Sequence, residues 1–284
     1  MHSEMVDLYD CFPVTRPEGA RACLTGWFSH WGEVVCRKRS RPAVLILPGG
    51  GYEHTSLREA EPVALRFLAQ GYVPFVLHYS CAPLTFPSSM REAAMAIKYI
   101  RQNARRFEIN PEMVAVIGFS AGGHLCGCLG TMYDAPEVAD IGSPAELRPD
   151  ALGLCYPVAV SWGRTHEGTF QNITGGGGQL RKRLSLETLV RPDMPPVFLW
   201  HTRQDTAVPC RNSLLLAAAL EEKGVSFVLH VYNKGIHGLS LANDLVYPEG
   251  SVPEVSRDVP TWPETMLEFF REQGFCIADE ERSV

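Results

Sequence analysis

Short apolar runs alternate with stretches of helical periodicity along most of the chain. A run that is apolar throughout is typical of a strand covered on both faces, as in a parallel sheet. Such runs predict strands at residues 43–47, 72–79, 113–117, 151–156, 197–201 and 226–232. Helical patterns lie between them, so the order of elements predicts an α/β fold with a mostly parallel central sheet and helices on both faces.

Serine or threonine, followed three residues later by glutamate, marks the start of several predicted helices. This is capping-box spacing, in which the two side chains satisfy free backbone N–H groups. It occurs at Ser56 and Glu59, at Ser89 and Glu92, and at Thr261 and Glu264. Helices are predicted over 59–70, 89–107, 211–223 and 261–270, with another directly after Gly122. An antiparallel hairpin of 22–28 with 32–36 is expected in an N-terminal region, residues 1–40.

The composition is that of a globular domain. Of the 284 residues, 45% are hydrophobic and 20% are charged, which excludes a disordered protein. Because α/β folds reach about 250 residues as one unit, residues 1–284 are expected to form a single domain. The net charge of −6 argues against a nucleic-acid partner. No apolar run is long enough to span a membrane, and residues 1–10 lack a secretion signal, so a cytoplasmic location is expected.

The nine cysteines are expected to be reduced thiols, because no secretion signal precedes them. Cys126 and Cys128 are two residues apart, which is not a usual metal-ligand spacing. They are expected to pack as small apolar side chains in a buried helix. No metal and no cofactor are therefore predicted.

Candidate chemistry begins at Gly118-Phe119-Ser120-Ala121-Gly122, between a predicted strand and a predicted helix. Gly-x-Ser-x-Gly in this context is typical of a nucleophile elbow, a turn so sharp that the serine adopts a positive φ. Strand and helix approach closely there, so the flanking positions must be small. A turn rich in small residues with no catalytic role is the alternative interpretation.

A serine nucleophile needs a base, and the base needs an orienting carboxylate. Asp205 follows the strand predicted over 197–201, and His237 follows the strand over 226–232. The order Ser, Asp, His is that of elbow-type hydrolases. Each residue alone could be a turn aspartate or a surface histidine. Because all three follow the carboxyl ends of parallel strands, their joint placement predicts a catalytic triad.

The segment Pro48-Gly49-Gly50-Gly51-Tyr52 follows the first predicted parallel strand. Elbow-type hydrolases place there a loop whose backbone N–H groups bind an oxyanion, and glycine keeps those groups accessible. A phosphate-binding loop is the alternative. It is poorly supported, because no Gly-Lys-Ser/Thr follows.

Five stretches give the sequence a family resemblance, namely residues 47–52, 58–62, 118–124, 200–205 and 235–240. Through them, residues 40–275 resemble α/β-hydrolases of the acetyl-xylan esterase and carbohydrate-esterase type, which are related to prolyl-oligopeptidase-like and hormone-sensitive-lipase-like hydrolases. The resemblance implies the α/β-hydrolase fold. Pro48 stands where the lipase-like branch has a histidine, which argues against lipase-type substrates.

The resemblance also implies roles for individual residues. Ser120 would be the nucleophile, Asp205 the orienting acid and His237 the base. The oxyanion hole would consist of three backbone N–H groups, those of Gly50, Gly51 and Ala121.

Several side chains near these motifs have two interpretations each. The candidates for lining the substrate pocket, or for packing beside it, are Tyr52, His54, Trp162 and Trp200. His124 lies one turn into the elbow helix and is expected to make a structural hydrogen bond. Arg58 and Glu59 support the oxyanion loop or form an exposed pair at a helix start. The glycine run 175–178 is expected to be a flexible loop without chemistry.

The connection 157–196 lies where hydrolases of this type insert a lid. Part of it must supply an ordinary crossover helix, and the rest is polar or glycine-rich, with Arg164, His166 and Glu167 among its residues. Little or no cap domain is therefore expected. We expect a small acyl pocket with an open, polar alcohol side.

The expected function is that of a serine esterase that removes acetyl groups from acetylated sugars or xylo-oligosaccharides, with a small-molecule ester as its partner. A serine peptidase of the prolyl-oligopeptidase type is one alternative. A glycosidase would need two carboxylates paired across a sugar cleft. A non-catalytic binding protein with a hydrolase fold is a third alternative, and the sequence leaves open whether the chain forms a homo-oligomer.

Overall fold

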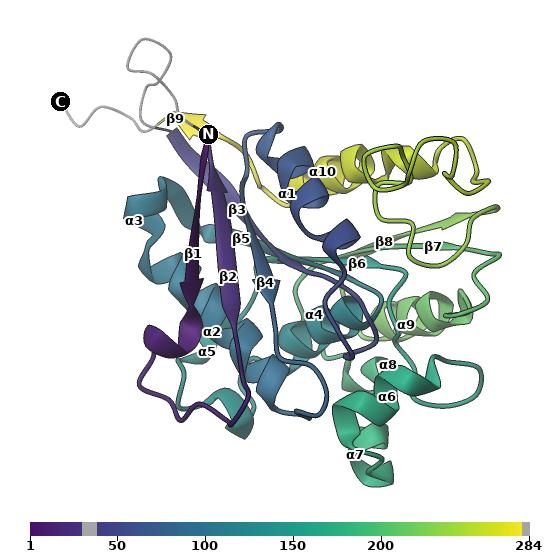
Figure 1. Ribbon diagram of the computed structural model, residues 1–284, viewed down its shortest axis with the longest axis horizontal. Coiled ribbons are helices and arrows are strands. Elements are labelled where there is room, and N and C mark those ends of the chain that lie inside the picture. Colours follow the sequence, from purple (N-terminus) through teal and green to yellow (C-terminus); the bar gives the residue numbers. More distant parts are fainter. Residues whose placement is uncertain (30–38, 280–284) are drawn as a thin grey trace.

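A single sheet organises the fold (Figure 1). The computed structural model describes residues 1–29 and 39–279. Its strands are β1 (His2–Asp7), β2 (Cys23–Phe28), β3 (Arg39–Leu47), β4 (Val73–His78), β5 (Ile109–Phe119), β6 (Ala151–Cys155), β7 (Val197–Thr202), β8 (Phe227–Tyr232) and β9 (Ala278–Asp279). Their order across the sheet is β1-β2-β4-β3-β5-β6-β7-β8, with β9 beside β3. In this order, the neighbouring strands β4, β3, β5, β6, β7 and β8 all run parallel to one another. The predicted mostly parallel sheet is therefore confirmed.

Helices cover both faces of this sheet. They are α1 (Glu61–Leu68), α2 (Ser88–Gln102), α3 (Ala104–Phe107), α4 (Ala121–Met132), α5 (Pro144–Leu147), α6 (Glu167–Thr174), α7 (Gly178–Arg183), α8 (Leu186–Leu189), α9 (Arg211–Glu222) and α10 (Trp262–Glu272). Short 3-10 helices are η1 (Leu8–Asp10), η2 (Leu57–Glu59), η3 (Pro136–Val138) and η4 (Val259–Thr261). As Figure 1 shows, α1 and α10 lie on one face and α2, α4 and α9 on the other.

The parallel strands are apolar throughout because their two faces are buried in separate cores. In β3, Ala43, Leu45 and Leu47 belong to the core beneath α2 and α4. Val44 and Ile46 belong to the core beneath α1 and α10. Successive side chains of a strand point to opposite faces, so a strand covered twice needs an apolar residue at every position.

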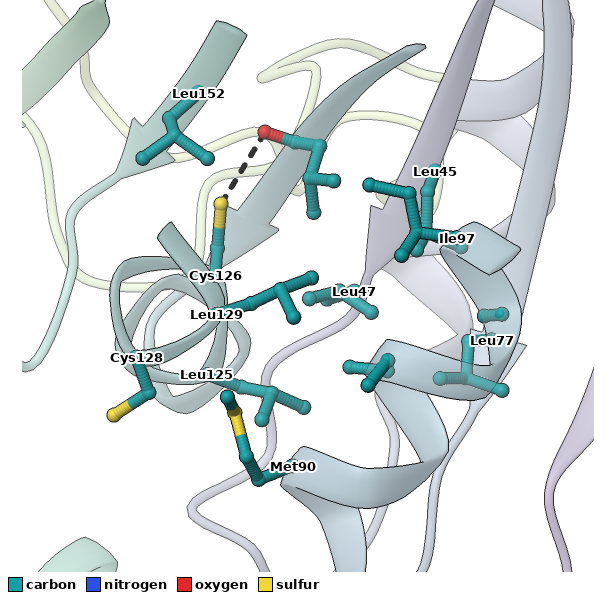
Figure 2. Close-up of a cluster of buried hydrophobic side chains, with 14 of the residues drawn as sticks. Leu45, Leu47, Leu77, Met90, Ile97, Leu125, Cys126, Cys128, Leu129 and Leu152 are labelled. Carbon is teal, nitrogen blue, oxygen red and sulfur yellow. Dashed lines mark hydrogen bonds between the residues drawn. The ribbon is translucent and has the colours of Figure 1, made fainter. Parts of the chain in front are cut away.

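Helix α4 packs on the first of these cores, as Figure 2 shows. Leu125 and Leu129 point from α4 toward α2, and Cys126 Sγ lies 3.2 Å from the carbonyl oxygen of Val116. Cys126 and Cys128 are both buried, as the sequence predicts. Every cysteine in the described part of the chain is free.

The N-terminal strands differ from the predicted hairpin. β2 pairs along one edge with β1 and along the other with β4, antiparallel in both cases. The segment 32–36, predicted as its partner, lies outside the described residues. β1 is an edge strand none of whose residues is buried, so it carries no apolar pattern that the sequence could reveal.

The three predicted capping boxes, whose residues all lie in the described part of the chain, do not form. Glu59 and Glu92 are instead only 3% and 0% exposed, respectively. Both carboxylates bind backbone and hydroxyl groups of other segments, which helix-start spacing cannot foresee. The predictions of capping at Ser56, Ser89 and Thr261 are therefore wrong.

Glu92 anchors the N-terminal segment to the end of β4. Its Oε1 accepts hydrogen bonds from the Tyr9 hydroxyl at 2.9 Å and the Ser80 hydroxyl at 2.6 Å. Its Oε2 accepts the Ser80 backbone N–H at 2.6 Å. Burial raises the pKa of Glu92 to about 7, although these hydrogen bonds act in the opposite direction.

The connection between β6 and β7 contains three short helices, α6, α7 and α8, all within its described residues. Gly175 ends α6 with φ +60°, and Gly177 caps α7, so the glycine run joins two helices. Within residues 1–29 and 39–279, no helix is both long enough and apolar enough to cross a bilayer.

Glu92→Gln should change how stability depends on pH. The pKa of Glu92 is about 7 in the folded state against an ordinary 4.5, so folding strengthens proton binding between these values. The bound proton stabilises the folded state, and this stabilisation is complete below pH 4.5 and is lost as the pH rises through 7. From about pH 5 to about pH 8, wild type should therefore lose about 2 kcal/mol of unfolding free energy relative to Glu92→Gln. Urea unfolding of both proteins measures this, and parallel pH curves would contradict the assignment.

Candidate active site

Ser120 occupies the sharp turn between β5 and α4 and has φ +53°. A Cβ on Gly118 would lie 2.1 Å from the carbonyl oxygen of Gly122. A Cβ on Gly122 would lie 2.0 Å from the carbonyl oxygen of Leu47. Atoms cannot approach this closely, so strand, helix and the end of β3 meet only because both positions are glycine.

The structure brings Ser120, His237 and Asp205 together at the carboxyl edge of the sheet. Ser120 Oγ lies 2.8 Å from His237 Nε2, and His237 Nδ1 lies 2.6 Å from Asp205 Oδ2. Because a carboxylate only accepts hydrogen bonds, Nδ1 carries the proton and Nε2 accepts from the Ser120 hydroxyl. Ser120 is 8% exposed and Asp205 5%, whereas the His237 side chain is 20% exposed.

Asp205 is held in place on both of its oxygens. Oδ1 accepts the backbone N–H groups of Ala207 at 3.0 Å and Val208 at 2.8 Å. His201 Nε2 lies 3.4 Å from Oδ2. Burial would raise the pKa of Asp205, but hydrogen bonds from His201 and His237 outweigh it and lower the pKa to about 2. Sequence reasoning assigned no role to His201, although its position four residues before Asp205, at a strand end, is a signal.

The loop after β3 passes directly beside Ser120. A Cβ on Gly49 would lie 3.0 Å from the Cβ of Ser120. Gly50 and Gly51 have φ +123° and +67°, which favour glycine. Among the described residues, no protein acceptor receives the N–H groups of Gly50, Gly51 or Ala121. Ala121 is the first residue of α4, where a backbone N–H has no partner within the helix.

Glu59 ties this loop to the loop that carries His237. Its Oε2 accepts the Gly49 N–H at 2.8 Å, and its Oε1 accepts the Tyr156 hydroxyl at 2.7 Å. The Tyr156 oxygen in turn accepts the Ser240 N–H at 2.9 Å. The Tyr156 ring meets the His237 ring edge-on, with centres 5.1 Å apart. Burial raises the pKa of Glu59, while the hydrogen bonds from Tyr156 and Gly49 lower it.

The sequence left two interpretations for Arg58 and Glu59, support of the glycine loop or an exposed pair. Glu59 is buried and supports the glycine loop. Arg58 is exposed, and its guanidinium donates to the Gly238 carbonyl at 3.3 Å. It also lies 4.7 Å from the centre of the Tyr247 ring. Arg58 thus contacts the segment that follows His237, whereas Glu59 contacts the glycine loop and reaches that segment through Tyr156.

His124 makes the structural hydrogen bonds expected of it. Its Nε2 donates to the Leu184 carbonyl at 2.8 Å, so its Nδ1 accepts from the Tyr52 hydroxyl, also at 2.8 Å. Burial lowers the pKa of His124 to about 4, so the ring is neutral. Tyr52 is 1% exposed, and its prediction as a pocket residue is wrong because its side chain faces His124 in the core.

Of the other three predicted pocket residues, one is buried and two are exposed. Trp200 is 0% exposed and packs against Tyr156 and Trp262, so it is a core residue and the pocket prediction is wrong. His54 is exposed, and its Cδ2 lies 3.1 Å from where a Cβ of Gly50 would be. Trp162 is 48% exposed on the β6–β7 connection. Its indole N–H donates to Glu187 at 2.7 Å, and the Arg211 guanidinium lies 5.0 Å from its ring centre.

A hydroxyl, an imidazole and a carboxylate in series can convert the hydroxyl into a nucleophile. Unpaired backbone N–H groups beside it can stabilise negative charge on a substrate oxygen. The chemistry that fits this arrangement is acyl transfer. In the described residues, no group of histidine, cysteine, aspartate and glutamate side chains could hold a metal ion.

Two family models match the chain. The BD-FAE model covers residues 35–144, and that of the prolyl oligopeptidase family covers residues 162–252. The first contains Ser120 and the glycine loop, and the second contains Asp205 and His237. Together the two matches therefore include Ser120, His237 and Asp205, the three residues that hydrogen bonds join at the site.

Known proteins resemble the chain over most of its length. It is 35% identical over 229 residues to endo-1,4-beta-xylanase B of Butyrivibrio fibrisolvens, covering 77% of the chain and 35% of that protein. It is 28% identical to an acetylxylan esterase of Xylanibacter ruminicola, covering 81% of the chain and 47% of that protein. The chain thus spans less than half the length of either curated relative.

A solved structure matches nearly the whole chain. The acetyl ester-xyloside bifunctional hydrolase of Caldicellulosiruptor lactoaceticus superposes with a TM-score of 0.79 at 33% identity. The match covers 96% of this chain and 97% of that one.

Glu59→Ala should destabilise the fold, because it leaves the Gly49 N–H and the Tyr156 hydroxyl buried without their acceptor. We expect a loss of about 2–4 kcal/mol in the free energy of unfolding, measured by urea denaturation. Glu53→Ala is the matched control, since the Glu53 side chain is exposed. That variant should stay within about 0.5 kcal/mol of wild type. Equal behaviour of the two variants would show that Glu59 does not hold these loops together.

Proposed function

The chain belongs to the α/β-hydrolase family, and on that premise we propose that it is a serine esterase that removes acetyl groups from acetylated sugars or xylo-oligosaccharides. The observation that carries the proposal is the hydrogen-bonded series from Ser120 Oγ through His237 to Asp205, with contacts of 2.8 and 2.6 Å. The N–H groups of Gly50, Gly51 and Ala121 have no protein acceptor among the described residues, and we assign the oxyanion hole to them.

In the first half of the reaction, Ser120 Oγ attacks the carbonyl carbon of the acetyl ester. His237 Nε2 takes the hydroxyl proton as the new C–O bond forms, and ionised Asp205 stabilises the imidazolium. The carbonyl oxygen becomes an oxyanion and accepts hydrogen bonds from backbone N–H groups. The tetrahedral intermediate then collapses, the ester C–O bond breaks, and the alcohol leaves with the proton from His237.

In the second half, water attacks the acetyl group now attached to Ser120. His237 takes a proton from the water and returns it to Ser120 Oγ as acetate departs. The products are the free alcohol, acetate and the original enzyme. The proposal invokes no metal and no cofactor.

Three observations support a small acyl group and a sugar alcohol. The β6–β7 connection bears exposed or half-buried polar side chains, including Arg164, His166 and Glu167. Trp162 leaves an exposed indole on the same segment, and aromatic surfaces suit sugar rings. The acetylxylan esterase of Xylanibacter ruminicola, among the relatives, is named for this substrate class.

A serine peptidase is a second candidate, because the prolyl oligopeptidase family model matches residues 162–252. The same three side chains would then cleave an amide. A glycosidase activity is a third candidate, because the similar solved structure is a bifunctional hydrolase of acetyl esters and xylosides. Aminoacyl amides and an aryl xyloside, assayed beside acetyl esters, separate the three.

Ser120→Ala should abolish esterase turnover while leaving the fold intact. We expect kcat to fall by about 10⁴-fold or more, because the variant lacks the oxygen that forms the acyl-enzyme. Hydrolysis of 4-nitrophenyl acetate measures this, with Ser251→Ala as a control at an exposed serine. Near wild-type turnover in Ser120→Ala would rule out the proposed mechanism.

Chain length should matter strongly on the acyl side. An acyl chain gains about 0.8 kcal/mol for each CH₂ only where apolar walls bury it, and we expect no such walls beyond the acetyl group. Because the acyl pocket is expected to be small, a longer chain would also clash with its walls, at a cost of about 1–3 kcal/mol. We therefore expect kcat/KM to fall by more than about tenfold from acetyl to octanoyl 4-nitrophenyl esters, and we expect acetylated xylosides to be hydrolysed. A preference for the octanoyl ester would instead point to lipase-like substrates.

A further inference from the structure

The β6–β7 connection packs against the glycine loop next to the triad. Asn172 Nδ2, on α6, donates to the Gly51 carbonyl at 2.9 Å. A Cβ on Gly51 would lie 3.6 Å from Cε1 of His166, the residue that caps the start of α6. The His166 ring therefore faces the loop that carries two of the proposed oxyanion donors.

Local hydrogen bonds set the proton position on His166. Its Nδ1 accepts the Thr169 backbone N–H at 3.2 Å and lies 2.9 Å from Thr169 Oγ1. Because Nδ1 is an acceptor, a neutral His166 carries its proton on Nε2. Nε2 has no hydrogen-bond partner among the described residues, and the ring is only partly buried. This N–H is thus a fixed donor available to a substrate.

His166 also lies close enough to the triad to feel its charges. Burial lowers the pKa of His166, the charge of His237 lowers it further, and Asp205 and Glu167 act in the opposite direction. A neutral donor results, which suits hydroxyl and ether oxygens. In ester cleavage the leaving alcohol must lie within reach of His237 Nε2, which returns its proton. A donor that contacts the glycine loop and is near enough to His237 for their charges to interact is therefore in a position to meet the leaving alcohol.

We propose that the Nε2–H of His166 is a substrate-binding donor that hydrogen-bonds a hydroxyl or ring oxygen of the sugar alcohol next to the scissile ester. The inference rests on the proposed function and assigns the sugar preference of that site to one residue. His166 makes no bond in the reaction and transfers no proton. An aryl acetate offers no hydroxyl for it to bind, so the donor distinguishes the two kinds of ester.

Two substitutions separate substrate binding from helix capping. In His166→Asn, the amide oxygen replaces Nδ1 as the cap of α6, since asparagine is among the best N-cap residues. This variant keeps the cap and lacks the Nε2 donor. In His166→Gln, the longer amide reaches the position of Nε2 and restores a donor. Urea unfolding of both variants, compared with wild type, checks that the fold is unchanged.

The test measures kcat and KM for an acetylated methyl xyloside and for 4-nitrophenyl acetate. In His166→Asn we expect kcat/KM on the xyloside to fall about 5- to 10-fold, mainly through KM, as for one lost neutral hydrogen bond. Activity on 4-nitrophenyl acetate should stay within about twofold, and His166→Gln should recover most of the loss on the xyloside.

Other results overturn the inference. His166→Asn could equal wild type on both esters, or lose activity equally on both, and either outcome would restrict His166 to a structural role. Wild type could cleave the aryl ester but no acetylated xyloside, which rejects the inference and leaves the esterase standing. Wild type inactive on both esters would reject the proposed function, and the inference with it.

Discussion

The site depends on a close backbone approach that excludes side chains. Glycines at 118 and 122 let β5, α4 and the end of β3 approach to distances at which a Cβ would lie 2.1 or 2.0 Å from a carbonyl oxygen. This approach puts Ser120 at φ +53° and brings the glycine loop beside it. It also leaves the first N–H of α4 unpaired next to the serine. The candidate nucleophile and the candidate oxyanion donors therefore have a common geometric origin.

Buried carboxylates connect the loops around this turn. Burying a charge is costly unless it is hydrogen-bonded. Glu59 and Glu92 each accept several hydrogen bonds from other segments, and Asp205 accepts hydrogen bonds from its own turn and from His237. Their pKa values nevertheless differ in direction. Burial dominates at Glu59 and Glu92 and raises the pKa, whereas His201 and His237 lower that of Asp205. The difference follows from the partners, since Asp205 accepts hydrogen bonds from two imidazoles, whereas Glu59 and Glu92 accept theirs from hydroxyl and backbone N–H groups.

The β6–β7 connection supplies the outer wall of the same region. Its short helices place Asn172 on the carbonyl of Gly51 and His166 against the same glycine. On the inner side, His124 bonds both Tyr52 and the carbonyl of Leu184. The glycine loop is thus held from its outer and its inner side. A loop fixed in this way meets the condition for the proposed electrostatic stabilisation of an oxyanion, because its N–H groups need not rearrange.

The sequence alone determined the elements whose pattern reflects a local requirement. The parallel strands were predictable because burial on two faces demands an apolar residue at every position. The elbow was predictable because its crowding demands glycine, and Ser120, Asp205 and His237 follow the carboxyl ends of strands that a parallel sheet must bring to one edge. Polar edge strand β1 leaves no such pattern.

Tertiary structure alone decided which partner each remaining side chain found. Glu59 has the spacing of a helix cap, yet its hydroxyl partner, Tyr156, lies 97 residues away. Trp200 and Tyr52 stand next to the candidate catalytic motifs, but both side chains point into the core, and no local signal records this direction. The role proposed for His166 likewise arises from a contact with Gly51 across the fold. Local sequence encodes periodicity and backbone strain, whereas the partner of a buried polar group or an aromatic ring exists only after distant segments have packed together.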